Sequence, residues 1–208
     1  YPMEDLLRLI ALESHRHRAI VIGEDLGTVP PGFSDQLAER GLLGLRVLPF
    51  QRQGRDFLRP EQWSTAAAAM TSTHDLPTVA GWWQGRDIAV RADLGLAKEA
   101  EAWGERAADR TALWEAFQAA GLVTGACPGN EAAPAVVDAA VAYVARSASE
   151  LALIPLEDLL GLEEQPNLPG TIDEHPNWRR RLGRTVAQFL EERQVIPRLG
   201  ALRERFRQ

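Results

Sequence analysis

The chain has 208 residues, of which 45% are hydrophobic and 25% are charged, with a formal net charge of −6 at pH 7. These values are those of an ordinary water-soluble protein, and the length allows one domain with a sizeable core. The negative charge argues against nucleic acid as a partner, because the sequence offers no basic face for a polyanion. The single cysteine, Cys127, excludes an internal disulfide, and no apolar run has the length of a membrane span. We therefore expect a cytoplasmic protein.

The chain opens with a predicted helix over 3–18, followed by a predicted strand over 19–22. Four aliphatic residues bounded by Gly23 are typical of a strand that is buried on both faces of a parallel sheet. The helix is expected to pack outside this sheet, because its apolar side chains share one face. These side chains are Met3, Leu6, Leu7 and Ile10.

Three further strands are predicted at 45–50, 65–70 and 151–156. The second of these contains four consecutive alanines, which favour a helix by propensity, but the alternation of elements along the chain indicates a strand. Residues 84–150 have no strand-like run and predict an insertion of two or three helices. Other helices are predicted at 33–40, near 60–63, at 178–192 and at 196–206, and an extended loop at 166–176. Four parallel strands with helices between them predict an α/β fold, the second half of a (β/α)₈ TIM barrel.

Acidic residues follow the first and third predicted strands. Glu24 and Asp25 come after one strand, and His74 and Asp75 come after the other. The carboxyl ends of barrel strands carry the reacting groups of α/β-barrel enzymes, so two carboxylates placed there suggest carbohydrate chemistry. Because side chains alternate along a strand, Glu24 is expected to face the pocket and Asp25 to be structural.

The motifs around these residues resemble a known family. They are GEDLGTVP at 23–30, GLRVLPF at 44–50, TSTHDLPTVAGWW at 71–83, NLPGT at 167–171 and NWR at 177–179. In wording, order and spacing they are similar to the amylomaltases, the 4-α-glucanotransferases of glycoside hydrolase family 77. The resemblance spans nearly the whole chain. It implies that residues 1–208 are the C-terminal part of a single catalytic barrel domain whose N-terminal half is missing.

The resemblance also implies roles for individual residues. Retaining transglycosylases use one carboxyl group as nucleophile and another as acid and base. In this family the acid/base is the glutamate of the GEDLG motif, here Glu24, and the THD motif supplies a transition-state-stabilising aspartate, here Asp75. The nucleophilic aspartate belongs to a motif of the Arg-x-Asp type at the end of a strand upstream of Glu24, and nothing before Tyr1 is present, so the chain alone is expected to be inactive. Glu24 has to keep its proton near neutrality, so its surroundings should be drier than those of Asp75.

Other residues are candidate sugar ligands or core residues. The resemblance makes His74 a donor to sugar hydroxyls, although such a histidine can also serve a core hydrogen bond. Asn167 is a candidate sugar ligand because an amide both donates and accepts. Arg46 either lines the barrel or reaches a sugar. At least one of the tandem tryptophans at 82–83 is expected in the core, and so is Trp178.

No metal or organic cofactor is implied by the sequence. His15 and His17 are two positions apart in a helix and do not share a face. The spacing of Gly23 and Gly27 fits neither a dinucleotide-binding nor a P-loop motif, and a serine nucleophile motif is absent.

The leading hypothesis is transfer of a segment of α-1,4-glucan to the 4-hydroxyl of another glucan or of glucose, with starch-like glucans and maltooligosaccharides as substrates. An α-glucan hydrolase on the same scaffold is one alternative. A non-catalytic glycan-binding or structural half-barrel is the other. A half-barrel exposes sheet edges, so self-association of the isolated chain is also expected.

Overall fold

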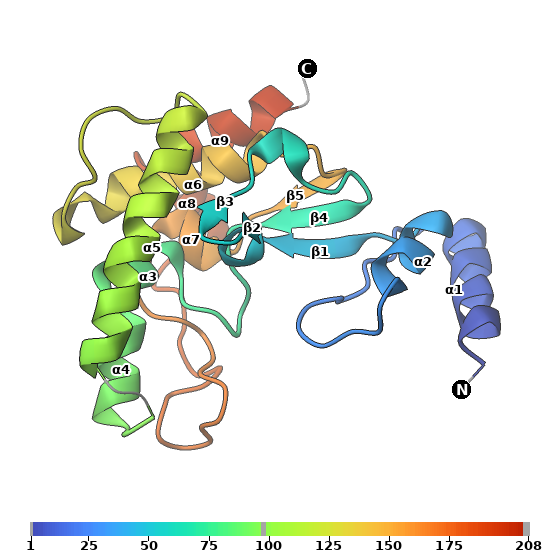
Figure 1. Cartoon of the computed structure of the whole chain (residues 1–208), viewed down its shortest axis with the longest axis horizontal. Coiled ribbons are helices and arrows are strands. Elements are labelled where there is room, and N and C mark those ends of the chain that lie inside the picture. The colour runs from blue at the N-terminus through green and yellow to red at the C-terminus, as the bar shows by residue number, and fades with distance from the viewer. Residues whose placement is uncertain (1, 97–98, 206–208) are drawn as a thin grey trace.

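The computed structural model describes residues 2–96 and 99–205 and has an α/β fold. Its sheet has three parallel strands in the order β1-β4-β5, formed by Gly44–Val47, Ala67–Met70 and Leu151–Leu153 (Figure 1). The central strand, β4, contains the alanine run, and its first three side chains have no exposed surface. The strand predicted there is confirmed, because burial between two neighbouring strands outweighs the helical propensity of alanine.

The first predicted strand is much shorter than expected. Residues 19–22 form only an isolated parallel bridge between Ile22 and Leu43, supported by a hydrogen bond from Leu43 N to Val21 O at 3.0 Å. Ile20 is 63% exposed, so burial on both faces was a wrong expectation. The physical reason is that this segment pairs along one side only within the described residues. The described sheet therefore has three strands and one bridge, where about four strands were expected.

Two helices lie beyond the amino-terminal end of β1, α1 over Met3–His17 and α2 over Phe33–Glu39 (Figure 1). Of the apolar face predicted for the first helix, only Leu7 is buried, in a small cluster with Leu37 and Leu42. Met3, Leu6 and Ile10 are 37%, 47% and 40% exposed. The expected packing of this whole face was wrong for the described residues, because α1 contacts α2 rather than a layer of sheet.

Helices form the main core on the other side of the molecule. They are α3 over Val79–Gln84, α4 over Arg86–Asp93, α5 over Glu99–Ala119 and α6 over Ala133–Ala145, with a 3₁₀ turn, η3, at Asn130–Ala132. The three α-helices that begin after residue 84 confirm the helices predicted there. Trp83 is fully buried in this core, as expected for one of the tandem tryptophans, whereas Trp82 is partly exposed.

The second predicted strand ends early. Pro49 lacks a backbone N–H, so β1 stops at Val47 and a 3₁₀ turn, η1, covers Leu48–Phe50. A hairpin of β2, Arg52–Gln53, and β3, Asp56–Phe57, follows and had not been predicted. The short helix expected near residue 60 is η2, Pro60–Gln62.

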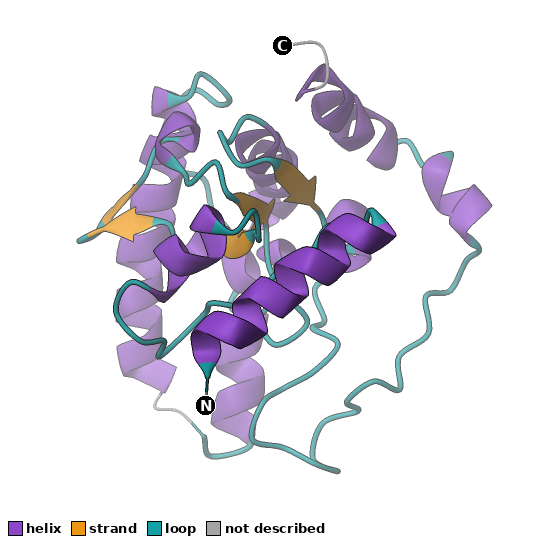
Figure 2. Cartoon of the chain, turned by 90° about the vertical axis from the view of Figure 1, so that its right-hand side faces the viewer, coloured by secondary structure: helices purple, strands orange, loops and turns teal. Residues whose placement is uncertain are grey.

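The C-terminal part differs most from expectation. β5 gives way to α7 over Leu156–Leu160, and residues 161–185 have no regular secondary structure (Figure 2). The helix predicted over 178–192 was wrong except for α8, Val186–Leu190. The last helix, α9 over Val195–Glu204, packs on α6 through buried Arg198, whose Nε lies 2.7 Å from Oδ1 of Asp138. Its predicted end at residue 206 lies outside the described residues.

Across the described part of the chain, the helices are all too short or too polar to cross a lipid bilayer.

Candidate active site

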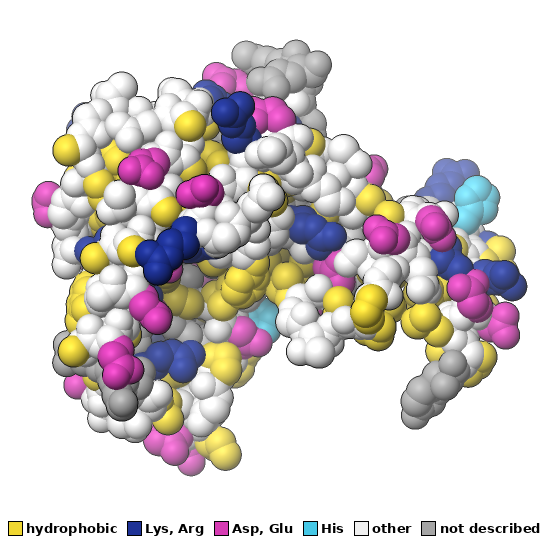
Figure 3. Space-filling view, in the orientation of Figure 1, with side chains coloured by type: hydrophobic (Ala, Val, Ile, Leu, Met, Phe, Trp, Pro, Cys, Tyr) yellow, Lys and Arg dark blue, Asp and Glu magenta, His cyan; other side chains and the backbone are white. Residues whose placement is uncertain are grey.

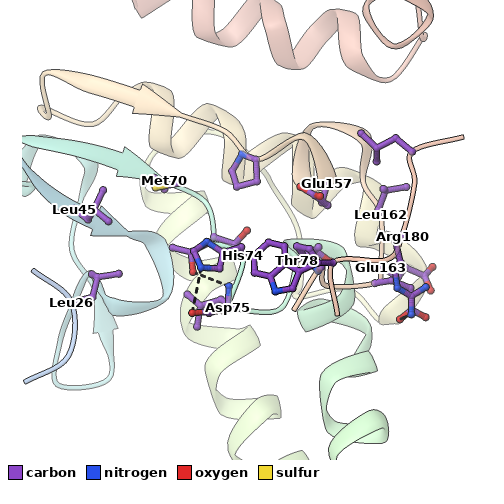
Figure 4. Close-up of a pocket in the computed structure, with 18 of the residues that line it drawn as sticks. Leu26, Leu45, Met70, His74, Asp75, Thr78, Glu157, Leu162, Glu163 and Arg180 are labelled. Carbon is purple, nitrogen blue, oxygen red and sulfur yellow. Dashed lines mark hydrogen bonds and ion pairs between the residues drawn. The ribbon is translucent and has the colours of Figure 1, made fainter. Parts of the chain in front are cut away.

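A cavity of about 880 Å³ lies at the carboxyl ends of the parallel strands. Leu45 of β1 and Met70 of β4 lie on its floor, and the loops that follow β4 and β5 form much of its wall (Figure 4). Figure 3 shows a hollow with a hydrophobic floor between the main body of the molecule and the α1–α2 side. Four of the charged or titratable side chains that line it are Glu24, His74, Asp75 and Glu157.

Glu24 and its neighbour Asp25 point to different surroundings. Glu24 lines the cavity, whereas the Asp25 side chain has no exposed surface. Asp25 accepts hydrogen bonds from Ser34 Oγ at 2.6 Å and from Leu45 N at 2.8 Å, and forms an ion pair with Arg46 at 2.9 Å. The structural role expected for Asp25 is therefore confirmed. Burial alone raises the pKa of this carboxyl, but the hydrogen bonds from Ser34, Arg46 and Leu45 together lower it below its ordinary value.

Arg46 binds Asp25 and does not face the cavity. It follows Leu45 along β1, so the two side chains leave opposite faces of the sheet. Its Nη1 donates to both oxygens of Asp25 and to Leu45 O at 2.6 Å, and Arg46 is not one of the residues that line the cavity. Its expected contact with a sugar stays a prediction, and the observed contacts favour an indirect role in fixing the backbone beside Glu24.

The loop after β4 brings three of the predicted residues together. His74 Nε2 lies 3.4 Å from Asp75 Oδ2, and Asn167 Nδ2 donates to Asp75 Oδ1 at 2.6 Å. The side chains of His74 and Asp75 are 56% and 50% exposed, so both face the cavity and solvent rather than the core. His74 therefore does not have the buried hydrogen bond that was its structural alternative.

Hydrogen bonds within the irregular C-terminal segment fix the position of Asn167. Asn177 accepts from Leu168 N at 2.9 Å and donates to Thr171 Oγ1 at 2.9 Å. Gln165 Nε2 donates to the carbonyl oxygen of Asn167 at 2.6 Å. The NLPGT and NWR motifs thus form one loop that is held together by hydrogen bonds and that places the Asn167 amide against Asp75.

Trp178 is not a core residue, and this expectation was wrong. The residue is 64% exposed, lines the cavity and lies with its ring centroid 5.2 Å from that of His74. Its φ of +59° is in the left-handed region, which a bulky residue rarely adopts. A turn at 177–179, closed by a hydrogen bond from Arg179 N to Pro176 O at 3.2 Å, replaces the start of the predicted helix, and Trp178 N donates to Pro166 O at 3.0 Å. This bond holds the tryptophan on the cavity side of the loop.

Glu157 and Asp158, which lie in α7 shortly after β5, are not among the predicted site residues. Glu157 lines the cavity, and Asp158 is fully buried. Burial raises the pKa of Asp158, while hydrogen bonds from Ser72, Thr71 and Val79 act to lower it. The sequence signal that could have identified Glu157 and Asp158 is that they form an acidic pair after a strand, as Glu24 and Asp25 do.

The surroundings of Glu24 are not dry in the described residues. Glu24 and Asp75 are both exposed, so the expected difference, a drier site around Glu24 than around Asp75, is absent here. The reason is geometric, because the hollow is open on the face that Figure 3 presents. Within 2–96 and 99–205, no three His, Cys, Asp or Glu side chains gather closely enough to hold a metal ion.

Comparison with known proteins gives concordant matches. A family model described as 4-alpha-glucanotransferase matches residues 1–186. The chain is 41% identical over 189 residues to the 4-alpha-glucanotransferase of Mycobacterium tuberculosis (strain H37Rv), a match that covers 86% of this chain and 25% of that protein. It is 31% identical over 194 residues to the 4-alpha-glucanotransferase of Haemophilus influenzae, which covers 90% of this chain and 28% of that protein.

Solved structures agree with these matches. The crystal structure of amylomaltase from Corynebacterium glutamicum superposes with a TM-score of 0.89 at 27% identity, over 97% of this chain and 31% of that one. Amylomaltase from Streptococcus agalactiae in complex with acarbose superposes with a TM-score of 0.62 at 18% identity, over 99% and 35%. The second likeness shows the fold alone. The chain spans about a quarter of the length of the curated relatives and about a third of these structures.

Proposed function

Because the chain belongs to the 4-alpha-glucanotransferase family, we propose that it is the C-terminal part of a longer enzyme that transfers segments of α-1,4-glucan. The observation that carries this proposal is that Glu24 and Asp75, from two separate motifs, line the same cavity at the carboxyl ends of the strands. The rest of the length seen in the relatives would supply the other half of a (β/α)₈ barrel. In this view 84–150 is a helical insertion within one catalytic domain.

Glu24 acts in this proposal as general acid and then as general base. Its proton goes to the glycosidic oxygen as the bond from anomeric carbon to oxygen breaks, and an aspartate from the preceding part of the enzyme forms the glycosyl–enzyme bond. In the second half-reaction Glu24 takes the proton from the 4-hydroxyl of the acceptor, whose oxygen displaces the aspartate. The anomeric configuration is retained because two displacements occur.

Asp75 stays ionised and stabilises the positive charge that develops on the sugar ring, while His74 and Asn167 contact sugar hydroxyls. The hydrogen bond from Asn167 Nδ2 at 2.6 Å and the contact with His74 at 3.4 Å hold the Asp75 carboxyl group in one orientation. The carboxylate is therefore ready to oppose charge in the transition state without reorganisation.

The open cavity and the apolar surface of the isolated chain support two further parts of the proposal. With water able to reach Glu24, the chain by itself would neither form the covalent intermediate nor exclude hydrolysis.

Ile20, Leu6 and Leu9 are exposed by 63%, 47% and 55%, so the isolated chain should self-associate through this side. Light scattering on the 208-residue chain tests this, and a stable monomer across concentrations would contradict it.

The alternative reaction on the same scaffold is hydrolysis of the glucan, in which water replaces the acceptor hydroxyl. The names of the relatives favour transfer. The test is incubation of the full-length protein with maltotriose, with measurement of the longer oligosaccharides and of reducing ends. Transfer gives a ladder of longer products with a constant number of reducing ends, whereas hydrolysis raises that number.

The variant Glu24→Gln tests the assignment of the acid/base. The ladder should collapse, since glutamine cannot donate the proton, while the fold is kept. An unchanged ladder in Glu24→Gln would place the acid/base elsewhere. Absence of a ladder in the wild-type protein, with glucan still bound, would favour the non-catalytic glycan-binding alternative.

A further inference from the structure

The fully buried carboxylate of Asp158 has no part in the chemistry described above. Asp158 is the third residue of helix α7 and has no exposed surface. An aspartate is rarely found in such a place unless hydrogen bonds satisfy both of its oxygens. Both are satisfied here, and all of the partners come from a distant part of the chain.

The partners of Asp158 lie at the two ends of one loop. Thr71 Oγ1 and Ser72 Oγ, just after β4, donate to Oδ2 at 2.5 Å and 2.6 Å. Val79 N, at the start of α3, donates to Oδ1 at 2.7 Å. The loop between them, 73–78, contains His74 and Asp75 and lines the cavity (Figure 4). One carboxylate therefore ties the beginning of this loop to its end.

We propose that Asp158 is a positioning residue that holds the His74–Asp75 loop in its reactive geometry. The proposal rests on the proposed function, because it assumes that Asp75 acts on the sugar. Asp158 touches no substrate and acts through Thr71, Ser72 and Val79. Without the carboxylate, two hydroxyls and one N–H are left buried without an acceptor, so the loop has to move to find partners.

The preceding residue connects this anchor to the cavity. Glu157 is partly buried and lines the cavity, just as Glu24 does beside buried Asp25. In both acidic pairs the first carboxylate faces the cavity and the second binds a neighbouring strand or loop. The repeated arrangement indicates that the second acid of each pair sets the position of the cavity wall.

The experiment compares Asp158→Asn with wild type in the full-length protein. Asparagine keeps the shape of the side chain, but its N–H₂ group cannot accept the hydrogen bonds that one of the two carboxylate oxygens accepts. We expect kcat for maltotriose disproportionation to fall about 100-fold, because a displacement of about 1 Å at a reacting group costs that much, and KM to change much less. Hydrogen exchange followed by mass spectrometry should show faster exchange in peptides that cover 71–79.

Two kinds of control separate positioning from general loss of stability. Ser149→Ala removes a fully buried hydroxyl that donates to Ser64 O at 2.8 Å, just before the amino ends of β4 and β5 and so away from the cavity, and should lower the melting temperature with kcat unchanged. Thr71→Val deletes one donor and should lower kcat, whereas Thr71→Ser keeps the hydroxyl and should restore it. These Thr71 variants decide the question if Asp158→Asn does not fold.

Three outcomes would overturn the proposal: a folded Asp158→Asn protein with unchanged kcat, no change in exchange over 71–79, or an equal loss of kcat in Ser149→Ala. If the wild-type protein itself makes no product ladder, the proposed function fails. The exchange experiment still decides in that case whether Asp158 holds the loop, since it needs no activity.

Discussion

Asn167 donates a hydrogen bond from Nδ2 to Oδ1 of Asp75 at 2.6 Å and so joins two motifs that are 92 positions apart in the sequence. The contact places an amide against one oxygen of the carboxylate, while His74 lies 3.4 Å from the other oxygen. Asp75 is thus oriented on both sides before a substrate arrives. Asn167 has a positioning role in addition to its proposed role as a sugar ligand.

The first prediction concerns this contact. Asn167→Asp replaces the donor with a second carboxylate next to Asp75, and the repulsion between the two should rotate Asp75 away from its present orientation. We expect kcat for the maltotriose reaction to fall about 10- to 100-fold, with an unchanged melting temperature because the site is exposed. Asn130→Asp is a matched control, since Asn130 Oδ1 accepts from Arg110 outside the cavity and the carboxylate keeps that contact. Equal kinetics of Asn167→Asp and wild type would contradict the inferred contact.

Much of the α/β pattern could be predicted from local sequence. The alternation of elements along the chain predicts the strand at 65–70 against the helical propensity of its alanines, and Ala67, Ala68 and Ala69 are fully buried in β4. The contrasting roles of Glu24 and Asp25 followed from the alternation of side chains along an extended segment.

The remaining differences depend on contacts between distant segments. Trp178 lies outside the core because it has a left-handed backbone in the turn at 177–179 and donates to Pro166 O, and no periodicity in the sequence encodes that turn. The ion pair of Arg46 with Asp25 and the hydrogen bonds of Asp158 join segments that are neighbours only in space. Residues 19–22 form only a bridge to Leu43, because a buried strand needs a pairing partner on each side and the described residues supply one side only.

The second prediction concerns Trp178, whose backbone is strained and whose ring faces the cavity. Trp178→Ala and Trp178→Gly both remove the ring, so both should raise KM for maltooligosaccharides about five-fold, the effect of losing an aromatic contact of about 1 kcal/mol. Glycine accepts a positive φ without strain, so Trp178→Gly should be more stable than Trp178→Ala by about 1 kcal/mol. Urea unfolding and steady-state kinetics measure the two effects. Equal stability of the two variants would mean that the strained turn relaxes once the ring is gone.

The third prediction concerns Gly81 in α3, where the chain of the irregular segment passes very close. A Cβ added at Gly81 would lie 2.1 Å from the carbonyl oxygen of Glu163, a backbone atom that cannot move alone. Gly81→Ala should therefore destabilise the protein by about 1–3 kcal/mol and lower activity, because Glu163 lines the cavity.

Gly104 in α5 is the matched control for Gly81. Beyond its chain neighbours and the nearby backbone of its own helix, no described atom lies within 4 Å of a Cβ built at Gly104. Gly104→Ala should stabilise the protein by about 1 kcal/mol through its higher helix propensity, without effect on activity. Thermal melting of the two variants gives opposite signs if the close approach is real, and a rise in melting temperature for both would contradict it.

The last prediction is a pH dependence at Tyr143. The side chain is 1% exposed and donates to Leu58 O at 2.8 Å, and burial raises its pKa from 10.0 to about 12. Between these values the unfolded chain has lost the phenolic proton and the folded chain keeps it. The unfolded state then binds fewer protons, so the free energy of unfolding falls as pH rises through this window, by about 2–3 kcal/mol in total. Tyr143→Phe has no such proton and should lack this part of the decline.

At neutral pH Tyr143→Phe should cost only about 1 kcal/mol, because Leu58 O keeps the hydrogen bond from Trp63 Nε1 at 3.2 Å. The two stability curves are therefore expected to converge as pH rises above 10 and to cross before both proteins unfold. Urea unfolding at a series of pH values measures this directly. Parallel curves for wild type and Tyr143→Phe would show that the phenol titrates alike in the folded and unfolded states, and that burial at the α6 core does not hold its proton.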